Sequence, residues 1–155
     1  MKIVWKLPRK SSIKFGFTLI ELLLTVSIVT LLAVPVASVG TSFLTRNDLQ
    51  NNVNELVSAL RTAQINSMSG KEDSTWGVAV TGTEIVKFMG ANYASRDPNY
   101  DVKFTIPQKI TISSFELVFD KLTGNPSSTQ IITLGNEIGE SHTVMVNEVG
   151  VVDVN

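Results

Sequence analysis

The sequence predicts an α+β protein in which a long N-terminal α-helix packs against a mainly antiparallel β-sheet domain. Residues 17–39 are apolar apart from a single charged group, Glu21. A stripe of apolar side chains with helical period follows over about residues 45–68. Short β-like runs separated by turn residues then occupy about residues 74–155. The first two features predict the helix, and the third predicts the sheet domain.

Charge is unevenly distributed along the 155 residues, which is a length typical of one domain. Residues 1–16 hold five bases and no acid, whereas residues 17–155 hold eight bases and 14 acids. Charged residues make up 17% of the chain, below the roughly 25% of average soluble domains. The sequence contains no cysteine, which excludes disulfides, thiolate metal sites and a cysteine nucleophile. The pattern indicates a basic leader, an apolar segment and an acidic domain.

The apolar run from Phe17 to Val39 is long enough to cross a membrane. As a helix it would extend about 35 Å, more than the roughly 30 Å of a bilayer's hydrocarbon core. The bases before it predict a cytoplasmic N-terminus and an extracytoplasmic C-terminal domain. A cleaved signal peptide is one alternative, although its apolar core usually has only about 7–15 residues. We therefore expect a single transmembrane helix over residues 17–40.

Glu21 is the unusual residue of this run, because a carboxylate in hydrocarbon costs roughly 2.5–3.5 kcal/mol. Such a group faces a partner or a cavity, or it reaches the lipid headgroups from near the end of the helix. Its neighbours are informative: Gly16-Phe17-Thr18-Leu19-Ile20-Glu21 follows the basic leader and precedes an uninterrupted apolar sequence. This arrangement resembles the processing site of type IV prepilins and of the pseudopilins of type II secretion systems.

The resemblance implies a processing pathway and a set of partners. A prepilin peptidase would cleave between Gly16 and Phe17 and convert Phe17 to N-methylphenylalanine. The retained helix would join other pilin or pseudopilin subunits in a helical filament, starting from membrane lipid and an inner-membrane assembly platform. Glu21 would pair with the new amine of a neighbouring subunit and set the axial register. Pro35 is interpreted as a helix kink, which a generic transmembrane proline explains equally well.

The second half of the predicted helix has one apolar face. Gly70 suits its C-terminal cap. Polar residues such as Asn52 lie largely off the apolar stripe. The stripe consists of Leu49, Val53, Leu56, Val57, Leu60 and Ala63.

The β-like part resembles the globular domain of H-type minor pseudopilins, in which an amphipathic helix, two small sheets and a terminal strand follow one another. A polar loop is expected at residues 93–100, and Asp120 and Asn125 are expected in a turn. The strand candidates are residues 76–80, 84–88, 102–106, 110–113, 115–119, 130–134, 143–146 and 151–154.

Asp97, Asn99 and Asp101 have the oxygen spacing that begins an EF-hand loop. Val102 replaces the glycine of that loop and Gln108 replaces its terminal glutamate, so the pattern favours a polar turn, with weak calcium binding as the alternative. We expect no other metal or cofactor.

Neither an enzyme nor a nucleic-acid-binding protein is expected. His142 is the only histidine, no catalytic motif surrounds it, and we interpret it as a strand-end or loop residue. The bases after residue 16 are scattered, whereas phosphate binding favours a cluster. Tyr93, Arg96 and Tyr100 could form a small aromatic–basic loop, but an ordinary solvated loop is favoured.

Three functional hypotheses remain. The first is a structural minor pilin or pseudopilin with a cleaved leader (1–16), a polymerisation helix (17–40) and an extracytoplasmic globular domain (41–155). An alternative is a tip or competence-type minor pilin that binds DNA, a surface or secreted cargo. A further alternative is an unprocessed β-domain protein anchored in the membrane.

Overall fold

The computed structural model describes residues 16–155, except for the side chains of residues 33–42. The chain divides into two units, residues 1–39 and residues 40–155. The expected leader, residues 1–15, lies outside the described residues. The backbone is helical at Pro35, whose side chain is among those not described, so the kink stays a prediction.

Helix α1 runs from Leu19 to Met68. Thr18 caps its N-terminus, since the hydroxyl oxygen of Thr18 accepts a hydrogen bond from the Glu21 backbone N–H at 3.3 Å. At the other end Gly70 adopts the left-handed conformation (φ 61°) and its N–H donates to the Ser67 carbonyl at 3.0 Å. The predicted glycine cap is therefore confirmed.

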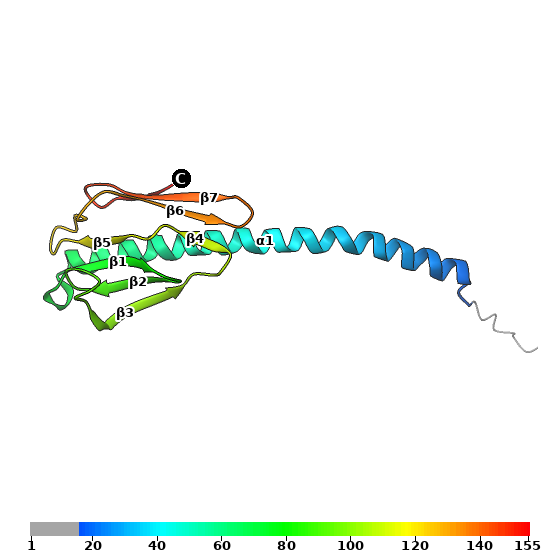
Figure 1. Cartoon of the computed structure of the whole chain (residues 1–155), viewed down its shortest axis with the longest axis horizontal. Helices are drawn as coiled ribbons and strands as arrows, with labels where there is room; N and C mark the ends of the chain where they lie inside the picture. The colour runs from blue at the N-terminus through cyan, green and yellow to red at the C-terminus, as the bar shows by residue number, and fades with distance from the viewer. Residues whose placement is uncertain (1–15) are drawn as a thin grey trace, which may run out of the picture. The chain divides into compact units, whose positions relative to one another are not determined.

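The globular domain, residues 40–155, contains two four-stranded antiparallel sheets (Figure 1). The strand order is β3-β2-β1-β5 in the first sheet and β4-β6-β7-β8 in the second. A short 3-10 helix, η1, links α1 to the first strand. The bounds are η1 Lys71–Asp73, β1 Trp76–Thr81, β2 Glu84–Met89, β3 Asp97–Thr105, β4 Ile110–Ile112, β5 Glu116–Phe119, β6 Gln130–Asn136, β7 Ser141–Val146 and β8 Val152–Val154.

Both sheets pack on the second half of α1 around one hydrophobic core. Leu56 and Leu60 of the helix are fully buried, together with Leu117 of the first sheet and Ile132 of the second. Burying a side chain of this size stabilises the fold by about 1.5–3 kcal/mol. The predicted stripe is buried throughout except at Val57, which is half-buried. The α+β fold class predicted from the sequence is confirmed.

The buried face of α1 is wider than the sequence predicts. Asn52 lies off the predicted stripe but is only 3% exposed, and Ala59 beside the stripe is 2% exposed. Two sheets contribute to the core around this helix, so more of its surface is covered than the stripe alone. The amide nitrogen of Asn52 donates to the Asp48 carbonyl at 2.9 Å, which partly offsets the cost of burying it.

The predicted polar loop at residues 93–100 is wrong in its second half, because β3 already begins at Asp97. Lys87 pairs with Val102 and Met89 pairs with Asp97, so residues 98–101 bulge opposite a single residue of β2. Such an irregular strand is difficult to predict from alternation. The preceding loop covers the first sheet, where Tyr93 packs edge-on against Phe88 with ring centroids 5.6 Å apart.

Two hydrogen-bonding side chains of α1 connect the helix to the C-terminal loops. The amide nitrogen of Gln64 donates to the carbonyls of Gly124 at 3.1 Å and Val149 at 3.4 Å. Arg61 donates to the Val152 carbonyl at 3.2 Å. Strand β8 therefore joins the second sheet on one side and the helix on the other.

Candidate functional site: the N-terminal segment

The Gly16–Phe17 peptide bond lies outside any helix or strand, since α1 begins only at Leu19. Gly16 is exposed, and nothing among the described atoms would lie within 4 Å of an added Cβ. Phe17 is 82% exposed. A protease can therefore reach this bond without first unwinding a helix.

Thr18 and Glu21 have the spacing of a capping box, which a Thr-x-x-Glu sequence at a helix N-terminus indicates. The Thr18 hydroxyl accepts the Glu21 N–H, and Glu21 lies in the first turn, where the helix dipole favours negative charge. The sequence reasoning missed this role of Thr18, although the Thr-x-x-Glu signal was present. Glu21 thus has a place in helix initiation besides the role in assembly predicted for it.

The side chains of residues 17–32, which we call the N-terminal segment, are all exposed. Even the least exposed of its large apolar side chains, Ile28, is 48% exposed. These exposed side chains are Phe17, Leu19, Ile20, Leu22, Leu23, Leu24, Val26, Ile28, Val29, Leu31 and Leu32.

The hydroxyl groups of the N-terminal segment are bonded within the helix itself. Thr25 donates to the Leu22 carbonyl at 2.9 Å, Ser27 to the Leu23 carbonyl at 2.8 Å, and Thr30 to the Val26 carbonyl at 2.7 Å. A hydroxyl that donates to a carbonyl of its own helix has its proton already bonded, so it adds little polarity to the helix surface. Glu21 is then the one charged group of the segment.

No helix within the described residues is both long and apolar enough to span a bilayer.

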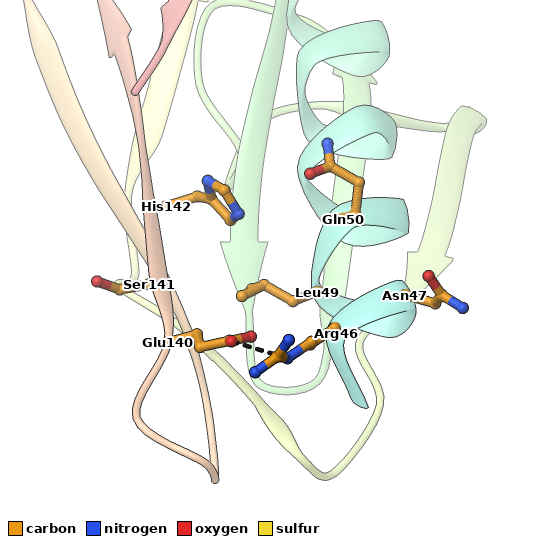
Figure 2. Close-up of a pocket in the computed structure, with 7 residues that line it drawn as sticks. All are labelled: Arg46, Asn47, Leu49, Gln50, Glu140, Ser141 and His142. Carbon is orange, nitrogen blue, oxygen red and sulfur yellow. Dashed lines mark ion pairs between the residues drawn. The ribbon is translucent and has the colours of Figure 1, made fainter. Parts of the chain in front are cut away.

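A second candidate is a groove of about 590 Å³ between α1 and the β6–β7 hairpin (Figure 2). Arg46 and Glu140 point toward one another and form an ion pair at 2.9 Å, with side chains 64% and 38% exposed. His142 also lines the groove, but Figure 2 shows the Ser141 hydroxyl pointing away from it. The groove therefore holds a neutral ion pair and does not bring a nucleophile to a base.

The candidate calcium residues lie along β3, and both of their carboxylates have protein partners. Asp101 pairs with Arg96 at 2.9 Å and is 5% exposed, whereas Asp97 accepts hydrogen bonds from the Asn99 backbone and side-chain nitrogens at 3.0 and 2.9 Å. The described residues contain no cluster of three or more His, Cys, Asp or Glu side chains arranged to hold a metal ion. Calcium binding at Asp97, Asn99 and Asp101 stays a prediction.

The aromatic–basic loop does not present a free cation to a nucleic acid. Arg96 stacks on the Tyr93 ring at 3.8 Å and forms the ion pair with Asp101, which raises the pKa of the guanidinium. Tyr100 instead packs edge-on against Trp76. The structure thus separates the three residues into two internal contacts.

The turn and strand-end predictions are confirmed. His142 is the second residue of β7. In the loop after β5, the Asp120 N–H donates to the Asn125 carbonyl at 2.8 Å and the Gly124 N–H donates to the Asp120 carbonyl at 2.9 Å.

Comparison with known protein families gives a match near the N-terminus of the chain. Residues 12–37 match the prokaryotic N-terminal methylation motif. The chain therefore carries the prepilin-type signature of type IV pilins and pseudopilins, and its helix on antiparallel sheets is consistent with a pilin fold. Searches of curated proteins and of solved structures gave no match.

The motif supports a type IV pilin-like or pseudopilin-like protein that is anchored in a membrane and associated with a pilus. It also implies two classes of partner, a prepilin peptidase and other pilin subunits.

Proposed function

We propose that this chain is a non-catalytic, structural minor pilin or pseudopilin of a type IV pilus or a type II secretion filament. One observation carries the proposal: within the residues that match the methylation motif, an exposed Gly16–Phe17 bond outside any helix directly precedes a helix whose large apolar side chains are exposed. The precursor would cross the inner membrane once, with its basic leader in the cytoplasm and the globular domain outside.

Processing would use the exposed segment before Thr18, which belongs to no helix or strand. Gly16 lets the peptidase approach its carbonyl closely because it has no side chain. Cleavage would leave Phe17 with a free amine, which methylation converts to N-methylphenylalanine. The Thr18 cap and the helix remain after cleavage, since both lie on the retained side of the bond.

Assembly would pack the apolar surface of the N-terminal segment against neighbouring subunits. Lipid tails are as apolar as these side chains, so van der Waals packing between helices, rather than removal of apolar area from water, would favour the transfer from lipid to the filament core. Glu21 would receive the N-terminal amine of a neighbour, which offsets the cost of desolvating both charges and fixes the register.

The first experiment is mass spectrometry of the protein extracted from its native membrane. We expect a chain that begins at N-methylated Phe17. Gly16→Ala should leave the full-length precursor, and Gly40→Ala, which changes a glycine beyond the cleavage site, should be processed normally. A native chain that begins at Met1 would refute processing and favour an unprocessed membrane-anchored protein.

The second experiment separates the charge of Glu21 from its place in the capping box. Glu21→Gln retains a residue that serves in capping boxes but removes the charge, whereas Thr18→Ala removes the cap and keeps the charge. We expect both variants to be cleaved and only Glu21→Gln to be missing from purified filaments. Normal incorporation of Glu21→Gln would refute the charge pairing.

A further inference from the structure

Two lysines lie over one buried tryptophan where η1, β1 and β2 meet. The Lys71 ammonium lies 5.2 Å from the Trp76 ring centroid and the Lys87 ammonium lies 5.9 Å from it. Trp76 is 2% exposed, and its indole N–H donates to the Lys71 carbonyl at 3.1 Å. Tyr100 packs edge-on against the same ring, with centroids 6.0 Å apart. The ring is therefore fixed, and it holds two cations at one place.

These two lysines differ from every other base in the described part of the chain. Five of the other bases pair with a carboxylate, and Arg61 donates to a backbone carbonyl. Within residues 16–155, Lys71 and Lys87 have no carboxylate oxygen within the 4.0 Å of an ion pair. The five paired bases are Arg46, Arg96, Lys103, Lys109 and Lys121.

The surroundings of Lys87 destabilise its positive charge. Partial burial and the positive charge of Lys71 together lower the pKa of Lys87. Glu72 follows Lys71 in sequence, but it interacts with Tyr100, whose pKa it raises by its charge and by a hydrogen bond. An oxyanion placed between solvent and the ring would relieve the repulsion and accept charge-assisted hydrogen bonds from the ammonium groups.

We propose that Lys71 and Lys87 form a binding site for a carboxylate side chain of a partner protein. The surrounding charge favours an acidic side chain over a nucleic acid. Residues 17–155 carry a net charge of −6, with eight bases and 14 acids, and the other six bases already have partners. A polyanion needs a track of bases along its length, whereas a single acidic side chain needs only one pair of bases.

Trp76 provides a direct probe, because the only other tryptophan is Trp5 in the leader. The full chain carrying Trp5→Phe, kept in mild detergent, is titrated with a tetraglutamate peptide while the fluorescence of Trp76 is recorded. Anisotropy of a dye-labelled copy of the same peptide gives an independent affinity. We expect a saturable change in both signals.

The variants assign that change to the two lysines. Lys71→Ala and Lys87→Ala should each weaken binding about tenfold, because each loses one hydrogen bond to a charged group. Lys103→Ala is the matched control, since Lys103 already pairs with Glu84 at 3.4 Å, and it should leave the affinity unchanged. Glu72→Gln should tighten binding by removing a nearby negative charge.

Two results would overturn the proposal. The first is absent binding, or binding that the exposed variant Lys71→Ala leaves unchanged, because this variant removes a surface side chain and should still fold. The second is a higher affinity for an oligothymidylate of equal charge than for the peptide, which would assign the site to nucleic acid.

Discussion

The two ends of helix α1 contain similar residues and have opposite environments. The leucines of residues 17–32 are all more than half exposed, whereas Leu49, Leu56 and Leu60 of the second half are at most 1% exposed. The second half is stabilised by two sheets of its own chain. Burial is favourable for any apolar side chain, but the sequence of one segment does not say what buries it. The rest of the chain buries the second half of α1, and the N-terminal segment is left for a partner or a membrane.

Truncating a leucine in each half of α1 should change the free energy of unfolding by very different amounts. Leu60→Ala should lower the free energy of unfolding by about 2–5 kcal/mol, because it leaves a cavity in the core. Leu23→Ala, the same change in a side chain that is 54% exposed, should lower it by no more than about 0.5 kcal/mol. Urea unfolding of the full-length protein in mild detergent, followed by circular dichroism, measures both. Equal losses of free energy would contradict the difference in environment between the two halves of α1.

A smaller loss of free energy of unfolding should come from a substitution in the turn before β8, which contacts Gln64 of the helix. Gly150 has a φ of 79°, and an added Cβ would lie 2.2 Å from the Gln64 amide nitrogen. Gly150→Ala should therefore lower the free energy of unfolding by about 1–3 kcal/mol. Gly139→Ala has a similar φ of 85° but open space, so its cost should be about 1 kcal/mol. If thermal unfolding shows the same loss for both, the contact with Gln64 is unimportant.

The ion pairs of the globular domain should follow the same dependence on burial. Asp101→Asn removes the partner of Arg96, whose side chain is 20% exposed, and should cost about 1.5–3 kcal/mol. Glu84→Gln breaks an exposed pair with Lys103 and should cost less than about 1 kcal/mol. Denaturant midpoints of the two variants provide the test, and an equal or reversed order would contradict it.

The smallest effect concerns a carboxylate on the surface. A hydrogen bond and the positive charge of Lys121 lower the pKa of Asp73 below its usual value of 3.8. The stabilisation from this pair is therefore complete above about pH 4 and is lost as the pH falls through the lowered pKa. Nuclear magnetic resonance titration should show the Asp73 pKa rising toward 3.8 in Lys121→Met. An unchanged pKa would exclude Lys121 as the cause.

Local patterns in the sequence predicted much of the fold. The apolar stripe of α1, the Gly70 cap and the positions of the strands follow from periodicity and turn residues. The hairpin of residues 76–80 and 84–88 was predicted from its turn and is confirmed as β1 and β2. The pairing of β5 with β1 could not be predicted in this way, because the two strands are more than 30 residues apart. The burial of Asn52 could not be predicted either, since it depends on which sheets contact the helix.

One candidate site could be predicted from the sequence and the other could not. Gly16, Phe17 and Glu21 could be identified because their motif is contiguous, and the Thr18 cap was readable from the same residues. The pair Lys71 and Lys87 could not be found, since it depends on Trp76 lying on the strand next to β2 and on η1 folding back over the ring.

The hydroxyls of the N-terminal segment have one further consequence. Because Thr25, Ser27 and Thr30 bond to their own helix, a neighbouring helix or lipid chain meets a surface without directional bonds. Rotation or sliding along that surface breaks no hydrogen bond and changes only dispersion contacts, which are individually worth about 0.1–0.2 kcal/mol. A bundle of such helices would tolerate small shifts in register while resisting separation, because dispersion contacts are individually weak but collectively large.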